Sequence, residues 1–239
     1  MKHAKTVAMA VVAGAMLAVQ SAPVRAQASG DRPTVAVMHF NNGAIGKWHE
    51  EYDALRVGIA DLLLTELAAN EAIRVVERDQ LAQVMREQDL SAGGRVDKET
   101  AVRVGRLLGA HHMIFGGFVI DARGTLRIDV RAVNTETSQI EYVETVQDKS
   151  DNFVLAVSRL AERINAGMKL PALTQDVREA RHEQAREVPF KAALLYSRAV
   201  ADETNGEPER AVERYRALLA EFPDYEPAQR ALARVKTGA

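Results

Sequence analysis

One charged triplet in this 239-residue chain has residue types that could do chemistry, namely two carboxylates beside a guanidinium. Glu77, Arg78 and Asp79 lie between a β-branched run, residues 73–76, and a helical pattern that begins at Leu81. A carboxylate at a helix start is stabilised by free amides and by the helix dipole, for about 0.3–1 kcal/mol. We therefore interpret the triplet as a strand-to-helix junction rather than a site, and we expect alanine at Glu77 and Arg78 to lower stability only modestly.

Histidines are the second candidates, because histidine is the commonest metal ligand. His111 and His112 are adjacent at the start of an apolar strand pattern, where neighbouring side chains point to opposite faces and do not readily share one ion. His39, His49 and His182 have no Glu or Cys at ligand spacing. The sequence therefore predicts no metal site.

Sequence motifs of common enzymes are missing from the chain. It contains no G-x-S-x-G, no Walker loop and no G-x-G-x-x-G that opens a helix. Gly116 and Gly117 lie inside an apolar strand pattern, which is typical of close packing by a neighbouring helix or of a bulge. We predict a non-enzymatic protein without catalytic residues or cofactors.

The first residues have the pattern of a secretory signal peptide. Lys2 and Lys5 precede an apolar run, residues 7–19, and Ala-Gln-Ala at 26–28 has the small-x-small pattern of a cleavage site. We predict a signal peptide at residues 1–28. With no cysteine, the chain has neither disulfides nor a thiol for a lipid anchor, so the expected location is the periplasm, with peripheral association to the outer membrane as an option.

The charge balance bears on the partners. Three of the 31 basic residues and none of the 33 acidic residues lie in residues 1–28, so the mature chain would carry 28 basic and 33 acidic groups. Binders of phosphate backbones usually show a basic balance. We expect no nucleic-acid partner, no integral membrane span and no lipid anchor.

Hydrophobic periodicity predicts an α/β domain with a mixed sheet and flanking helices. Predicted helices cover residues 51–69, a segment from 81, residues 98–108 between an Asp97 cap and Gly109, and residues 151–166. A break in the second helix is expected at Gly93-Gly94. Predicted strands cover residues 34–40, 73–76, 112–120, 125–133 and 139–147, of which the last three form a meander.

The carboxy-terminal part has helical patterns only. A charged stretch, residues 174–188, is a predicted linker helix, and two helices at 190–202 and 208–221 precede a third. The residues that resemble the turn and second helix of a tetratricopeptide repeat are Gly206, Ala211, Tyr215 and Pro223, with a plain helical hairpin as the alternative.

The apolar residues of these helices exceed what one short hairpin encloses. We expect the charged linker to hold the helices away from the α/β domain, so that an intermolecular contact covers them. The predicted partner-binding residues are Leu194, Leu195, Tyr215, Leu218 and Phe222.

Five ordered blocks resemble a known family: TVAVMHF, ADLLLTELAAN, RVVERDQLAQVMREQ, VGRLLGAHHMIFGGF and DVRAVNTETSQI. Residues 33–170 resemble the curli production assembly/transport (CsgG-like) family, which is similar in fold to the amino-terminal domain of TolB. The resemblance implies a mixed sheet of the TolB amino-terminal, anticodon-binding-like type. The family's best-known members are lipidated and carry two long hairpins, where this chain has only DARG after Ile120 and QDKS after Val146.

These observations predict four segments: a signal peptide at 1–28, a CsgG-like α/β domain at 33–170, a linker helix at 171–189 and a tetratricopeptide-like module at 190–236. The expected function is that of an envelope scaffold for assembly or secretion that binds protein partners, with a homo-oligomer as one such assembly. The alternative is a subunit of an outer-membrane curli-type secretion channel.

Overall fold

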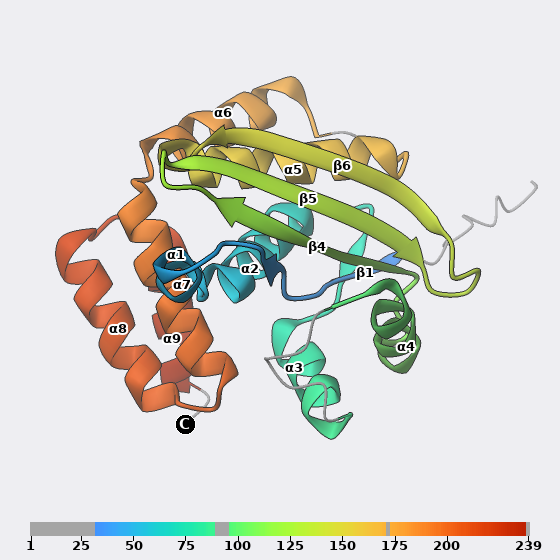
Figure 1. Ribbon diagram of the computed structural model, residues 1–239, viewed down its shortest axis with the longest axis horizontal. Helices are drawn as coiled ribbons and strands as arrows, with labels where there is room; N and C mark the ends of the chain where they lie inside the picture. The colour runs from blue at the N-terminus through green and yellow to red at the C-terminus, as the bar shows by residue number, and fades with distance from the viewer. Residues whose placement is uncertain (1–31, 89–95, 171–172, 238–239) are drawn as a thin grey trace, which may run out of the picture. The chain divides into compact units, whose positions relative to one another are not determined.

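The computed structural model describes residues 32–88, 96–170 and 173–237, all of which belong to one compact unit, Arg32–Ala239 (Figure 1). The predicted signal peptide and the predicted helix break at Gly93-Gly94 lie outside the described residues. Among the described helices, none combines the length and the apolar content that a bilayer crossing needs.

A six-stranded mixed sheet forms the centre of the fold. Its strands follow the order β3-β1-β4-β5-β6, and β2 also pairs with β4. β1 pairs in parallel with β3 and β4, whereas β4, β5 and β6 form the predicted antiparallel meander. The strands are β1 (Thr34–Val37), β2 (Asn41–Asn42), β3 (Arg74–Val75), β4 (His112–Ile120), β5 (Thr125–Asn134) and β6 (Ile140–Lys149).

Local signals explain several helix ends. Asp97 caps its helix as predicted, because its carboxylate accepts the Thr100 amide, which holds the pKa of Asp97 below its usual range. Gly109 ends the same helix with a left-handed φ of 64°. The helices are α1 (Lys47–Tyr52), α2 (Leu55–Ala68), α3 (Arg78–Glu87), α4 (Lys98–Leu108), α5 (Phe153–Gly167), α6 (Gln175–Glu187), α7 (Phe190–Thr204), α8 (Pro208–Glu221) and α9 (Glu226–Thr237).

Three local predictions differ from the structure. The single helix expected at 51–69 is two helices, α1 and α2. The helix expected at 151–166 begins at Phe153, and Asp151 lies in a 3-10 turn before it. A Cβ on Gly116 would lie 2.1 Å from the Asp129 carbonyl oxygen, so this glycine admits a neighbouring strand and not a helix.

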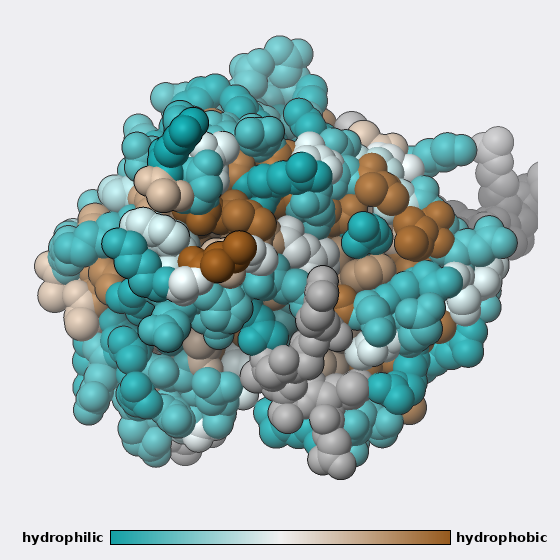
Figure 2. Space-filling model, in the orientation of Figure 1, coloured by the Kyte–Doolittle hydropathy of each residue, from teal (hydrophilic) through white to brown (hydrophobic). Residues whose placement is uncertain are grey.

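The two faces of the sheet are covered unequally. α2 and α5 bury one face, while α3 and α4 cover part of the other around Ala36, Met113 and Val133. The rest of that second face carries apolar patches among hydrophilic side chains (Figures 1 and 2). Val119 and Val143, which are 38% and 60% exposed, belong to the exposed apolar residues of β4 and β6.

The carboxy-terminal helices share the core of the sheet. Tyr196, Val200, Tyr215 and Leu218 belong to the same apolar cluster as the residues of α2, α5 and the strands. α7 packs on α2 at Gly58, where a Cβ would lie 1.8 Å from Ser197 Oγ. The expectation that these helices stand away from the α/β domain is therefore wrong.

The charged helix α6 explains the error. It packs along α5, and its basic side chains pair with acidic residues of α2 and α5 rather than with solvent alone. Arg178 binds Glu162, and Arg181 Nη1 lies 3.3 Å from Glu66 Oε2. A charged pattern shows that a helix has a polar face. Such a face also packs against another helix when that helix carries residues of opposite charge.

The close approach at Gly58 makes a testable prediction. In Gly58→Ala the new methyl group overlaps Ser197, so α2 and α7 must separate, and we expect the free energy of unfolding to fall by about 1–3 kcal/mol. Denaturant titration measures this loss. Ser197→Gly is the matched control, and the double variant should lose less than the sum of the two single variants. Strict additivity would contradict the proposed contact.

Candidate functional site

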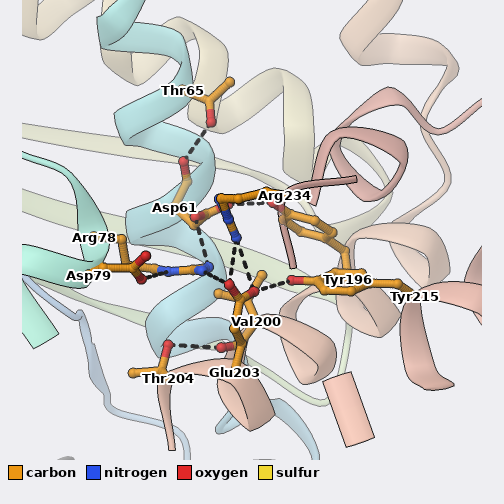
Figure 3. A network of polar contacts seen from close by, with 10 residues as sticks. All are labelled: Asp61, Thr65, Arg78, Asp79, Tyr196, Val200, Glu203, Thr204, Tyr215 and Arg234. Carbon is orange, nitrogen blue, oxygen red and sulfur yellow. Dashed lines mark hydrogen bonds and ion pairs between the residues drawn. The ribbon is translucent and has the colours of Figure 1, made fainter. Parts of the chain in front are cut away.

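A buried ion cluster joins the α/β part of the chain to the carboxy-terminal helices (Figure 3). Its centre is Arg78, the first residue of α3, whose side chain is 9% exposed. Arg78 Nη1 lies 3.2 Å from Asp61 Oδ1 of α2, and its Nη2 lies 2.5 Å from Glu203 Oε1 of α7. The cluster consists of Asp61, Arg78, Tyr196, Glu203, Tyr215 and Arg234.

Hydroxyl groups and a second arginine complete the cluster. The Tyr196 hydroxyl donates to Asp61 Oδ2 at 2.5 Å, and the Tyr215 hydroxyl donates to Glu203 Oε2 at 2.9 Å. Arg234 of α9 donates to both oxygens of Glu203, at 2.7 and 3.0 Å. Two carboxylates thus meet two guanidinium groups, and the cluster is electrically balanced.

The protonation states follow from these contacts. Burial alone would lower the pKa of Arg78, but the carboxylates of Asp61 and Glu203 outweigh it and raise this pKa. Burial, and then the charge of Asp61, raises the pKa of Tyr196 well above its ordinary value. Arg78 therefore stays charged and Tyr196 stays a neutral donor, which is suited to a structural joint.

The cluster corrects our explanation of the charged triplet. Glu77 is the N-cap residue of α3, so the triplet does join a strand to a helix, but Glu77 is exposed and its side chain makes no capping hydrogen bond. Asp79 Oδ1 lies 3.8 Å from Arg78 Nε, at the exposed margin. The interactions of the triplet run through Arg78, which binds partners 17 and more residues away.

His39 lies beside the cluster with its own unusual environment. It is 8% exposed, and its Nε2 finds no hydrogen-bond partner among the described residues. A cavity of about 10 Å³, close to the space of one water molecule, is bounded by His39, Asp61 and Arg78. Burial, followed by the positive charges of Arg56 and Arg78, lowers the pKa of His39 to about 4.

The other histidines make separate contacts. His111 Nδ1 accepts the Thr34 amide at 3.0 Å, whereas His112 Nδ1 lies 2.9 Å from Glu141 Oε2. His49 is exposed beside Asp53. His182 Nε2 lies 3.4 Å from Glu162. Within the described residues, no three potential ligands gather in one place.

A groove of about 890 Å³, which we call the helical groove, lies between α6 and the corner that joins α8 to α9. Apolar residues from α2, α5, α6 and the corner between α8 and α9 line it, namely Leu62, Val154, Ala185, Phe222 and Tyr225. Acidic residues also line it. Glu187 and Asp224 are exposed and form no ion pair with any described residue. The groove therefore has both apolar and charged walls.

The five residues predicted to bind a partner have different positions. Tyr215 and Leu218 are 0% and 1% exposed and lie in the core. Leu194 and Leu195 are half-buried against that core, and Phe222 is half-buried and lines the helical groove. Only Phe222 of the five reaches this groove, so partner binding through the set stays a prediction.

Sequence reasoning missed the residues that matter most at the joint. Gly58 and Asp61 interrupt the apolar pattern of α2, and an isolated glycine or carboxylate inside such a pattern is a usable signal of close packing or of a buried pair. The signal identifies each residue but not its partner, because Ser197 and Tyr196, which contact Gly58 and Asp61, are remote in the chain.

Residues 15–121 match the family model described as curli production assembly/transport component CsgG. This segment carries a CsgG family domain. Within the described residues it runs from Arg32 to the end of β4, so β5, β6 and helices α5–α9 follow it. Asp61 and Arg78 lie inside the CsgG segment, whereas Glu203 and Arg234 lie outside it.

Several solved structures are similar to this chain. The LpoB carboxy-terminal domain from Escherichia coli is 17% identical, with 49% of this chain and 83% of that chain covered and a TM-score of 0.38. TolB from Acinetobacter baumannii is 11% identical, with coverage of 57% and 28% and a TM-score of 0.38. Dodecameric PelC from Paraburkholderia phytofirmans is 9% identical, with coverage of 58% and 89% and a TM-score of 0.39. Comparison with curated protein sequences finds no match.

We predict that Arg78→Met destabilises the chain far more than the substitution of an exposed arginine. Among the described residues, removing Arg78 leaves Asp61 without an ion-pair partner and leaves Glu203 paired with Arg234, and breaking a buried pair in this way costs about 3–5 kcal/mol. Denaturant titration gives the free energy of unfolding. Arg74→Met, on the exposed side of β3, is the control and should change stability by less than about 0.5 kcal/mol. Adding Asp61→Asn to Arg78→Met should restore part of the lost stability. If Arg78→Met and Arg74→Met changed stability equally, a buried pair at Arg78 would be excluded.

We also predict a pH dependence that comes from His39. Its pKa is about 4 in the folded chain and near 6.5 when unfolded, so between these values the unfolded chain binds the extra proton. The histidine therefore lowers stability as pH falls from about 6.5 to 4, by about 1.4 kcal/mol for each pH unit. In His39→Gln, unfolding curves at pH 4.5 and 7 should differ less than in the wild type. His49→Gln, at an exposed position, should leave the wild-type difference unchanged, and a His39→Gln chain that keeps it would contradict the assignment.

Proposed function

We propose that this protein is a non-enzymatic, exported scaffold for assembly or secretion in the cell envelope, and that it holds a segment of a partner protein in its helical groove. The helical groove is the observation that carries the proposal. Its volume of about 890 Å³ falls in the range of binding sites, which is about 300–1,000 Å³.

The walls of the groove suit an amphipathic protein segment. Leu62, Phe222 and Tyr225 offer an apolar side, and apolar anchor residues of a helix or an extended segment bind surfaces of this kind. Phe222 and Val177 remain partly exposed there, so they are available for contact.

The charges of the groove indicate which charge the partner segment should carry. Glu66 is paired with Arg181, Glu221 with Lys191 and Glu226 with Arg230, which leaves the carboxylates of Glu187 and Asp224 without an ion pair among the described residues. Complementary charge steers and selects partners at such surfaces. The expected partner segment therefore carries lysine or arginine beside its apolar residues.

Location and role rest on two further arguments. The signal-peptide pattern of residues 1–28 supports export to the periplasm, and the missing cysteine argues against a lipid anchor. The matched CsgG model is described as an assembly/transport component, which supports a role in assembly or secretion. The same description also favours the alternative, a subunit of a curli-type secretion channel in the outer membrane.

Site-specific photo-crosslinking in cells that express the full chain tests the proposal. A benzophenone amino acid at Val177, which lines the groove, should give a discrete protein adduct in osmotic-shock fluid, whereas the same probe at the exposed Arg216 of α8 should not. Glu187→Lys with Asp224→Lys should abolish the adduct, because both carboxylates would become repulsive to a basic segment. The folded state should persist, since neither carboxylate forms an ion pair among the described residues.

Three outcomes would count against the proposal. Equal adducts from Val177 and Arg216 would show unspecific collision. An adduct that survives the two charge reversals would exclude a basic partner segment. Recovery of the chain only in a large assembly that needs detergent for extraction from the outer membrane would favour the channel subunit.

A further inference from the structure

β6 is a long edge strand that the helical groove does not involve. It runs for 10 residues at the end of the strand order β3-β1-β4-β5-β6, and among the described residues no strand pairs with it on the side away from β5. An unpaired edge presents a row of amide and carbonyl groups that accepts another strand.

The ladder between β5 and β6 shows which groups face the free edge. The Ser150 amide donates to the Gly124 carbonyl, and hydrogen-bonded pairs alternate with non-bonded pairs along an antiparallel ladder. Starting from this pair, the residues that direct their amides and carbonyls outward are Lys149, Gln147, Thr145 and Val143.

Two side-chain contacts agree with this assignment. The Thr145 amide donates to Glu144 Oε1 at 3.1 Å, and the Lys149 amide donates to Asp148 Oδ1 at 2.8 Å. These two outward amides are thus bonded to the carboxylates of their own preceding residues rather than to a neighbouring strand. Such contacts with an adjacent side chain are ones that an incoming carbonyl can replace.

We propose that β6 pairs antiparallel with β6 of a second copy of this chain, centred on Thr145, so that the two sheets become continuous. In this register Thr145 faces Thr145, Val143 faces Gln147, and Glu141 faces Lys149 of the second copy. At the first two pairs, the amides and carbonyls that face the free edge of one β6 meet those that face the free edge of the other, as an antiparallel ladder requires. Glu141, the extra residue of a bulge, ends the run beside the opposite charge.

Charge selects this register over its neighbours. Centring the pairing on Glu144 would place Glu144 opposite itself, and centring it on Val146 would place Glu144 opposite Asp148. Like charges directly opposite each other are destabilising, whereas opposite charges stabilise a cross-strand pair. The register centred on Thr145 places an acid opposite a base at both ends and uses nearly the whole strand.

Cysteine crosslinking tests the register, because the natural chain contains no cysteine. In the proposed pair the two Cα atoms of position 145 lie about 5.5 Å apart, within the range of a disulfide. Thr145→Cys treated with oxidised glutathione should therefore form a disulfide-linked dimer, with reduced glutathione as the other product. Gln147→Cys is the matched control, because its two copies would lie roughly 13 Å apart along the strands.

Sedimentation of the cysteine-free chain provides a second readout. The wild type should show a weak, concentration-dependent dimer, and Lys149→Glu should raise its dissociation constant severalfold. Glu141→Lys combined with Lys149→Glu should restore dimerisation, because the charges across the interface are exchanged, while the loss of the Glu141 contacts with His112 and Asn134 falls within each chain. Thermal melting of each variant shows that it is folded.

Several results would overturn the proposal. A wild-type chain that sediments as a monomer at every concentration would exclude the interface. Equal crosslinking at positions 145 and 147 would show random collision, and crosslinking at 147 alone would indicate another register. Failure of the charge exchange to restore the dimer would exclude the contact between Glu141 and Lys149.

Discussion

The buried charge of Arg78 is the constraint that organises this protein. A guanidinium group that is 9% exposed requires carboxylates at hydrogen-bond distance, because an unpaired buried charge costs several kcal/mol. Asp61 comes from α2 and Glu203 comes from α7, so satisfying one side chain ties three helices together. Tyr196, Tyr215 and Arg234 then occupy the remaining positions around the two carboxylates.

Helix α2 contributes to the core, to the ion cluster around Arg78 and to the helical groove. Its apolar residues pack on the sheet, and its Gly58 admits α7 at a distance that no other residue would allow. Its Asp61 enters the buried ion cluster, while Leu62 and Glu66 line the helical groove. One helix therefore supports the core, the joint and the proposed binding surface, and a shift of α2 would affect all three.

The sequence predicted the parts of the fold that depend on local chemistry. The pattern of residues 125–133 predicted a strand of the meander, and Asp97 and Gly109 predicted the two ends of α4, because caps and pleats act over a few residues. The two-residue strand β2 has no periodicity to find. The partners of Arg78 could not be predicted either, since periodicity shows that a face is buried and not which residues cover it. For the same reason, periodicity does not show that Tyr215, one of the residues predicted to bind a partner, is buried in the core of its own chain.

The ion cluster takes its charged residues from two parts of the chain, and the charges balance within each part. Asp61 and Arg78 lie in the segment that matches the CsgG model, whereas Glu203 and Arg234 come from helices beyond it. Each part thus contributes one acid and one base, and each pair is neutral by itself. Docking brings two neutral pairs together, so no net charge is moved into the interior and no long-range repulsion opposes the contact. Specificity then rests on short-range geometry, because Arg78 must reach both carboxylates while Gly58 leaves room for Ser197. A helical segment with the same apolar face but without Glu203 would bury the same area and yet leave Arg78 one partner short.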